Sequence, residues 1–176
     1  MRVLLLVAGL LVPLLSGCAT NLPPAVLMPR TVDAVPAPVT PSAFTSDPVT
    51  LEEGEVERYL SAESFKIALD ETLKRANLFG TDTATPYRLH AHVLKASFPG
   101  WGFTMASTLN VRYVLETPDG KPVLDHVVQY EGEATVCDRL LGASRARLAL
   151  QRTQQGHFTL LLERLKVALR PESSPN

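Results

Sequence analysis

The chain has 176 residues, of which 45% are hydrophobic, and it carries 17 basic residues against 18 acidic ones. This length fits one domain with a sizeable core, and the near-neutral charge argues against a protein that binds nucleic acid through overall positive potential. Two cysteines are too few for a disulfide-stapled scaffold or a four-cysteine zinc site.

Residues 1–17 are typical of a bacterial export signal. A basic start at Met1 and Arg2 precedes the uncharged run 3–15, which is shorter than the roughly 20 apolar residues that span a bilayer. The letters L-S-G-C at positions 15–18 then resemble the lipobox of bacterial lipoproteins at all four positions. That resemblance implies cleavage between Gly17 and Cys18 and attachment of lipid to the Cys18 thiol. The alternative is an uncleaved anchor with an inert cysteine.

A lipidated Cys18 would carry enough acyl chains to hold the protein on a membrane permanently. In lipoproteins of double-membrane bacteria, an aspartate after the cysteine signals retention in the inner membrane, and this chain has Ala19 there. The resemblance therefore implies export to the outer membrane, with the protein facing the periplasm.

Residues 18–50 form the lipidated N-terminus and a proline-rich stretch, which holds half of the 14 prolines of the chain. Such a composition disfavours a helix and prefers an extended form at about 3.1 Å per residue, which predicts a tether with a reach of up to about 90 Å if none of it folds back. Residues 39–45 could instead pair as an edge strand, where proline is tolerated.

A helix is predicted over about 61–78. Ser61 can cap its N-terminus, and Leu60 and Phe65 have the spacing of a hydrophobic staple. Apolar residues then recur at helical spacing until Gly80 ends the run.

Three strands follow, because apolar and polar residues alternate over 87–98, 103–116 and 124–136. The apolar parity shifts after Val93, as a bulge would produce, and residues 117–120 have the composition of a tight turn. A last helix is predicted over about 143–169, with Gly156 as a weak point or a close contact with the sheet.

This order predicts an α+β fold: a two-layer sandwich with two helices on one face of an antiparallel sheet of three to four strands. The domain should span 51–170, and 171–176 should be a disordered tail.

The same order of elements resembles a family of small proteobacterial envelope lipoproteins. The stretches that carry the likeness are SAESFKIALDETLKRANLF, PYRLHAHVL, FPGWGFTMASTLNVRYVL, SRARLAL and FTLLLERL. Members often carry the name UDP-N-acetylglucosamine acyltransferase, although enzymes of that name are β-helices of six-residue repeats and no such repeat is visible here. The layout is also similar to the auxiliary lipoproteins of lipid-trafficking systems and to the plug of the lipopolysaccharide-export barrel, which implies an accessory role in envelope transport.

Candidate metal ligands are few. His90 and His92 share one strand face, a spacing that can seed a metal site, but the pattern offers no third ligand. Polar residues facing solvent are the simpler interpretation. No metal site is therefore predicted, and no motif indicates a cofactor.

Candidate catalytic residues are equally weak. His126 falls in the apolar parity of its strand and fits a core histidine better than a general base. Ser107 with a histidine and Asp125 could be drawn as a triad, but no nucleophile-elbow pattern supports it. Glu131 and Glu133 share a strand face, as alternation produces routinely. We therefore predict a protein that is not an enzyme.

The second cysteine, Cys137, follows the last strand. If Cys18 is bound to lipid it cannot form a disulfide, so Cys137 has no partner within the chain. A buried, inert thiol is one expectation, and an intermolecular disulfide is the other.

Two segments have the composition of contact surfaces. Phe98, Trp101 and Phe103 lie at a predicted hairpin tip, where they could meet lipid or a protein groove or fold back over the sheet edge. The second segment, 139–162, contains no acid, which suits an anionic partner such as lipid phosphate, or else forms a solvated helix face. Its arginines are Arg139, Arg145, Arg147 and Arg152.

Together these patterns predict an outer-membrane-anchored periplasmic lipoprotein. It would be a noncatalytic accessory or binding subunit of an envelope assembly or lipid/solute transport complex, with an envelope protein as partner and no nucleic acid. The alternative is an envelope enzyme of acyltransferase type.

Overall fold

The computed structural model describes residues 24–31, 44–46, 49–51, 60–78, 87–98 and 100–169. Gly17, Cys18 and the predicted tail 171–176 lie outside these ranges. In chain order the elements are α1 (Pro24–Leu27), β1 (Phe44–Ser46), β2 (Thr50–Leu51), α3 (Ala62–Arg75), β3 (Tyr87–Ser97), β4 (Thr104–Glu116), β5 (Pro122–Thr135) and α4 (Gly142–Ala168). Within the described part of the chain, no helix combines the length and the apolar character needed to cross a bilayer.

Strands β3, β4 and β5 form an antiparallel meander, so the predicted α+β fold is confirmed. β1 and β2 both pair with the outer edge of β3, in parallel. Parallel neighbours need a crossover connection, which α3 provides between β2 and β3. Part of the expected edge strand is thus present at Phe44–Ser46, whereas 39–43 lie outside the described residues.

Local features of the meander agree with the sequence. The pairing of β3 with β4 shifts register between Val93 and Lys95, where the apolar parity predicts a bulge. The turn from Thr117 to Gly120 closes with a hydrogen bond from the Gly120 amide to the Thr117 carbonyl, 2.9 Å long. Gly120 has a φ of 78°, a conformation that glycine adopts at little cost.

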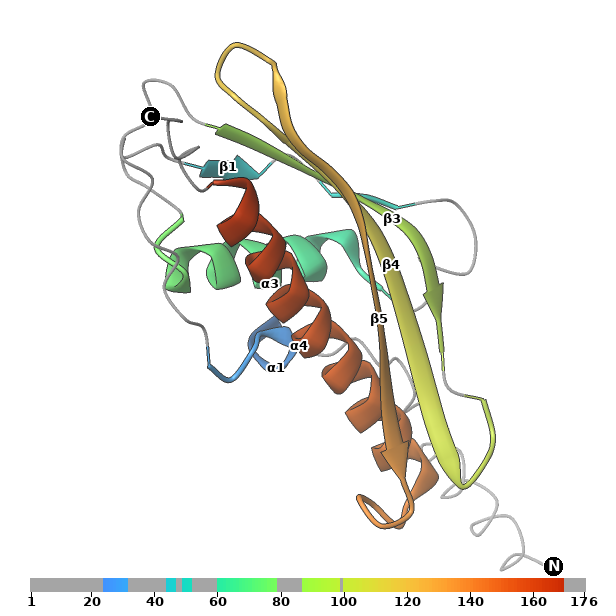
Figure 1. The fold of residues 1–176 in the computed structure, drawn as a ribbon. Helices are drawn as coiled ribbons and strands as arrows, with labels where there is room; N and C mark the ends of the chain where they lie inside the picture. The colour runs from blue at the N-terminus through green and yellow to red at the C-terminus, as the bar shows by residue number, and fades with distance from the viewer. Residues whose placement is uncertain are drawn as a thin grey trace, which may run out of the picture.

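One hydrophobic cluster joins both long helices to the inward side of the sheet. Phe65 of α3, Phe158 of α4 and Tyr113 of β4 are completely buried in it. In Figure 1 both helices lie on the same side of the sheet, and α4 runs along β5. The predicted cap is present, because the Ser61 hydroxyl accepts a hydrogen bond from the Ser64 amide. Leu60 is buried in the same cluster.

Two glycines bring α4 unusually close to β5. A Cβ on Gly156 would lie 2.1 Å from Cζ of Tyr130, and a Cβ on Gly132 would lie 2.4 Å from the backbone nitrogen of Thr153. Real Cβ atoms essentially never approach other heavy atoms so closely. Gly156 is therefore the predicted close contact between helix and sheet.

The proline-rich stretch differs from an extended tether in the part that the structure describes. Residues Pro24–Leu27 form α1, whose proline stands at the first helical position, where its missing amide hydrogen costs nothing. Met28 and Val49 are both buried in the main core. Residues 24–31 and 49–51 thus belong to the folded unit, because they carry apolar side chains that the helices and sheet can cover.

Candidate functional site

The most exposed large hydrophobic side chains of the described residues gather at one end of the molecule. Trp101 and Phe103, in the connection from β3 to β4, are 103% and 83% exposed. Leu140 and Leu141, in the connection from β5 to α4, are 89% and 73% exposed. We call these four residues the apolar tip.

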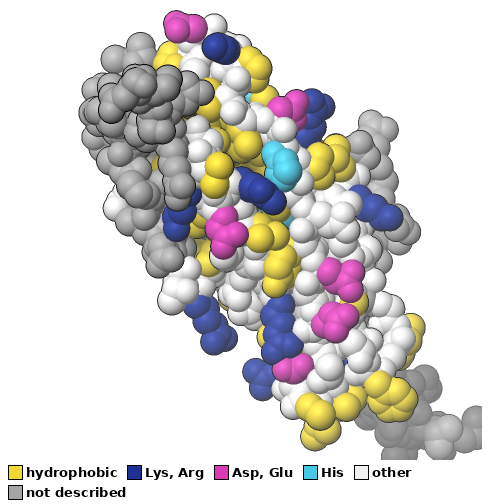
Figure 2. Space-filling model, in the orientation of Figure 1, with side chains coloured by type: hydrophobic (Ala, Val, Ile, Leu, Met, Phe, Trp, Pro, Cys, Tyr) yellow, Lys and Arg dark blue, Asp and Glu magenta, His cyan; other side chains and the backbone are white. Residues whose placement is uncertain are grey.

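The sheet register explains why the two connections meet. Thr104, at the start of β4, is paired with Thr135, at the end of β5. The segments that adjoin these residues therefore emerge side by side at the same end of the sheet, at the bottom of Figure 1. Figure 2 shows hydrophobic side chains at this lower end of the surface, with both basic and acidic side chains above them.

Arg145 fastens the two connections to each other. Its Nη1 donates to the carbonyl oxygens of Arg139, at 3.1 Å, and Leu140, at 2.6 Å. Its Nη2 donates to the carbonyl of Gly102, at 3.0 Å. A guanidinium is a rigid planar fork, and this side chain is buried. Arg145 therefore holds the backbone at Gly102 close to the backbone at Arg139 and Leu140, because one guanidinium group bonds all three carbonyls.

The predicted arginine surface is only partly correct. Arg145 is a buried clamp and is not available to an anionic partner. Arg152 is paired with Asp138 at 2.6 Å and also donates to the carbonyl of Glu133 at 2.7 Å. Its hydrogen bond holds the pKa of Asp138 far below its ordinary value. Arg139 and Arg147 are exposed, so these two can meet an anion.

The aromatic residues of the predicted hairpin tip divide in the same way. Phe98 is half-buried and packs against the main core, so this side chain folds back onto the domain. Folding back is wrong for Trp101 and Phe103, because both side chains are largely exposed. Cys137 is exposed in the turn after β5, so the expectation of a buried thiol is also wrong.

Leu140 and Leu141 are contact residues that the sequence patterns do not predict. Their signal is a pair of adjacent leucines between the end of a strand and the start of a helix, outside the periodic apolar stripe of either element. Leu141 also stands at the N-cap of α4, where it makes no side-chain capping hydrogen bond. Polar caps are strongly preferred at this position, which makes a leucine there unusual.

The histidines predicted to share a strand face are each engaged with a neighbouring strand. His90 lies 3.4 Å from a carboxylate oxygen of Glu116, and His92 is hydrogen-bonded to the Thr50 hydroxyl. In the described ranges, no group of three or more histidine, cysteine or acidic residues is placed to hold a metal ion.

The residues of the hypothetical triad do not meet. Ser107 is buried and donates its hydroxyl to the Ser97 carbonyl at 3.0 Å. Asp125 forms a two-pronged ion pair with Arg112, which lowers the pKa of the carboxyl. His126 is half-buried opposite Tyr113, whereas Ser107 is opposite Gly132. Six positions of β4 thus separate the serine from the histidine, or about 20 Å along the strand.

The fourth histidine, for which the sequence predicts no role, lies in the core. His157 is completely buried, and its Nε2 is 3.0 Å from the hydroxyl oxygen of Tyr113. Burial lowers the pKa of His157 to about 3, so the imidazole is neutral. Its helical spacing from Leu150 and Leu161 is the sequence signal that places it on the buried face of α4.

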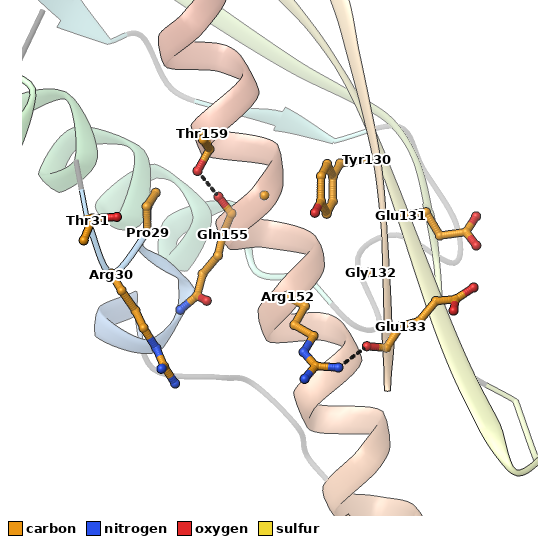
Figure 3. A pocket seen from close by; sticks show the side chains of 11 residues that line it. Pro29, Arg30, Thr31, Tyr130, Glu131, Gly132, Glu133, Arg152, Gln155 and Thr159 are labelled. Atoms are coloured by element: carbon orange, nitrogen blue, oxygen red, sulfur yellow. Dashed lines mark hydrogen bonds between the residues drawn. The ribbon is translucent and has the colours of Figure 1, made fainter. Parts of the chain in front are cut away.

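A shallow groove of about 370 Å³ lies between α4, β5 and residues 29–31. Figure 3 shows that Glu131 and Glu133 point away from α4, so the predicted carboxylate pair does not face the groove. Tyr130 lies between β5 and α4, and Arg152 reaches the backbone of Glu133. The groove therefore collects no set of free acid, base and nucleophile.

The fold recurs in solved structures with very different sequences. A protein of Xanthomonas campestris assigned to the family DUF330 is 11% identical, with a TM-score of 0.57 over 82% of this chain and 97% of its own. A hypothetical protein of Chlamydia trachomatis is 10% identical, with a TM-score of 0.51 over 73% and 98%. A candidate lipoprotein of Caulobacter crescentus is 14% identical over 72% and 90%, but its TM-score of 0.46 is too low to carry an argument.

At these identities the likeness shows a shared fold and nothing more. No protein-family model matches the chain, and no curated protein matches its sequence. The arrangement of a three-stranded meander with α3 and α4 is thus an architecture that this chain shares with the proteins from Xanthomonas and Chlamydia.

Proposed function

We propose that the protein is an envelope lipoprotein, anchored at Cys18 to the outer membrane and facing the periplasm. In this proposal it serves as a noncatalytic accessory or binding subunit of an envelope assembly or lipid/solute transport complex. The observation that carries the proposal is the apolar tip, whose side chains are held at the surface by a buried arginine.

Two physical arguments support a binding role for the tip. Single exposed hydrophobic residues are normal, but contiguous apolar patches on a monomer mark interaction sites. A flexible connection would bury Trp101 and Phe103 if it were free to fold back. The hydrogen bond from Arg145 to the carbonyl of Gly102 opposes this by fixing the backbone between the two aromatic residues. The bonds from Arg145 to the carbonyls of Arg139 and Leu140 fix the neighbouring connection in the same way.

The noncatalytic part of the proposal rests on how the candidate catalytic residues are used. Ser107 bonds the backbone of the neighbouring strand, Asp125 is paired with Arg112, and His157 is neutral in the core. Each of these groups has a structural role that accounts for its environment. None of them faces the groove beside α4.

A complementation experiment tests the proposal. A deletion strain receives the wild-type gene, a variant with Trp101→Ser and Leu140→Ser, a variant with His90, His92, His126 and Ser107 all changed to Ala, or the control Val167→Ser. Val167 is 65% exposed near the far end of α4, so this control removes an exposed apolar side chain away from the tip. We expect the tip variant alone to fail, at equal protein level and with an unchanged unfolding temperature.

Two further results decide the remaining parts of the proposal. Intact mass measurement of the purified mature protein should show acyl chains on Cys18, and Cys18→Ser should abolish both the lipid and complementation. A photo-crosslinking amino acid placed at exposed positions in living cells should capture a specific envelope component. Failure of the quadruple variant with an intact tip would favour the enzyme instead.

A further inference from the structure

We propose that the apolar tip enters the interface of the same membrane that holds Cys18, with Arg139 and Arg147 against anionic lipid headgroups. This inference deepens the proposed function and rests on its lipid anchor. It names the target of the tip as a lipid surface, and it makes the protein a two-point membrane binder.

The composition of the tip fits the boundary between headgroups and acyl chains. Tryptophan combines a large apolar ring with an indole N–H donor, and it concentrates at this boundary in membrane proteins. The tip presents Trp101 together with Phe103 and two leucines, all more than 70% exposed. Four such side chains projecting from two short connections resemble a wedge more than the flat rim of a protein interface.

Two exposed arginines adjoin the tip and fit an anionic surface. Arg139 is adjacent to Leu140 in the chain, and Arg147 follows in the second turn of α4; both are exposed. No acidic residue occurs between positions 139 and 162. The nearest preceding acid, Asp138, is paired with Arg152. Exposed cations beside apolar side chains strengthen attachment to anionic lipid.

The predicted anchor can reach the same plane. The carbonyl of Val26 accepts a hydrogen bond of 3.0 Å from the side chain of Gln155, which fixes α1 at the middle of α4. Gln155 lies 13 residues beyond Gly142, or about 20 Å along the helix. Cys18 precedes Pro24, where α1 begins, by six residues, which span at most about 22 Å. A lipid on Cys18 can therefore enter a bilayer that the tip also touches.

The rigidity of the tip favours binding without a conformational change. Arg145 already holds both connections in place, so the membrane does not have to order them. Avoiding that ordering cost is how preorganised surfaces gain affinity. The anchor adds a second advantage, since it keeps the tip at a high effective concentration near the bilayer.

The tryptophan makes the proposal directly measurable. Trp101 is the single tryptophan of the chain and belongs to the tip, so its fluorescence reports the position of the tip without a label. The lipidated mature protein is reconstituted into vesicles of phosphatidylethanolamine and phosphatidylglycerol, with or without brominated acyl chains. We expect a blue shift of the emission relative to detergent-free protein with Cys18→Ser, and quenching by the brominated chains.

Matched variants separate the apolar from the electrostatic contribution. With the unlipidated Cys18→Ser protein, we expect Leu140→Ser with Leu141→Ser to weaken vesicle binding at least about tenfold. Arg139→Gln with Arg147→Gln should weaken it about thirtyfold on anionic vesicles and have little effect on phosphatidylcholine. The controls Val167→Ser and Arg164→Gln, which change exposed residues near the far end of α4, should bind as the parent does.

Two outcomes would overturn the inference. One is Trp101 emission that stays solvent-like and unquenched in the lipidated, vesicle-bound protein. The other is binding that the control variants weaken as much as the tip variants do. If the tryptophan stays in water while crosslinkers at the tip capture an envelope protein in cells, the proposed function stands and the membrane target is wrong. If mature Cys18 carries no lipid, the proposed function itself fails.

Discussion

The hydroxyl oxygen of Tyr113 and Nε2 of His157 lie 3.0 Å apart in the centre of the core, where both side chains are completely buried. This contact joins β4 to α4 across 44 positions of sequence. Burial raises the pKa of Tyr113 well above its ordinary value and lowers that of His157 to about 3. Both groups are therefore neutral at pH 7, and the pair holds helix and sheet in register at little electrostatic cost.

We predict that His157 makes folding stability fall in mildly acidic solution. In the unfolded chain His157 has an ordinary pKa of about 6.5 and binds a proton below that pH. In the folded state its pKa is about 3, so it stays neutral until the pH falls near that value. The full contribution is present above pH 6.5 and is lost as the pH falls from there toward 3. The free energy of unfolding should drop by about 2 kcal/mol between pH 7 and pH 5, as urea titrations at each pH will measure.

The control for this effect is His157→Gln, which keeps a polar side chain of similar reach but does not titrate. It should be less stable than the wild type at pH 7, because one buried hydrogen bond is altered. Its stability should change little between pH 7 and pH 5. Parallel pH profiles for the two proteins would show that another group is responsible.

We predict that replacing either Gly132 or Gly156 with alanine lowers the stability of the fold. This holds even at Gly156, which lies in a helix, where alanine is ordinarily preferred. Gly132→Ala should destabilise more, by about 3 kcal/mol, because its Cβ meets the backbone of α4 and the helix must shift. Gly156→Ala should cost about 1–2 kcal/mol, because its Cβ meets the ring of Tyr130, which is the end of a movable side chain. Thermal unfolding of each variant measures the difference.

A double mutant identifies the cause at position 156. In the background of Tyr130→Ala, the clash is absent and alanine gains its usual helix preference over glycine, about 1 kcal/mol. The substitution Gly156→Ala should therefore change sign and become stabilising. If Gly156→Ala destabilises the Tyr130→Ala protein as much as the wild type, the clash with the tyrosine ring is not the reason for a glycine at this position.

Sequence periodicity predicted the elements of this fold because burial repeats with the geometry of helix and strand. The shift of apolar parity after Val93 marked the register shift that the structure contains, and Ser61 marked the start of α3. Periodicity did not reveal that Met28 enters the core, because an isolated apolar residue among prolines has no neighbours from which a period can be read. A tether and a packed segment share that composition.

The candidate site was less accessible to sequence reasoning than the fold. Trp101 and Phe103 were identified from their type and their place in a turn. The role of Arg145 was not, because a guanidinium on a helix looks the same in sequence whether it faces water or a carbonyl. The role of Arg145 depends on its hydrogen bond to the carbonyl of Gly102, which is 43 positions away in the chain. That meeting depends on the pairing of β4 with β5, which no local pattern contains.

We predict that Arg145 controls the order of the tip and not the order of the domain. Arg145→Leu removes three charge-assisted hydrogen bonds, so local opening of the connection after β5 should become easier by about 3 kcal/mol. Amide hydrogen exchange should accelerate in 136–142, while α3 keeps its protection. Arg145→Lys should restore little, because an ammonium cannot match the planar fork. Equal acceleration in α3 would mean that the clamp supports the whole core.

We predict that Met28 contributes to stability like a core residue, although its sequence context resembles a tether. Met28 is buried against the main hydrophobic cluster, so Met28→Ala should lower the free energy of unfolding by about 2 kcal/mol or more. Ala25→Ser changes an exposed position of α1 and should be nearly neutral. Chemical denaturation of the unlipidated mature chain distinguishes the two variants.

The result bears directly on how close the domain stands to its membrane. If Met28 and the Gln155–Val26 hydrogen bond fix α1 to the domain, a lipid on Cys18 keeps Pro24, and with it the domain, within about 20 Å of the membrane. Met28→Ala should then expose the segment before Thr31 to trypsin at Arg30 while the rest of the chain stays intact. A neutral Met28→Ala would mean that this segment is a free tether, which does not hold the domain at a fixed distance from the bilayer.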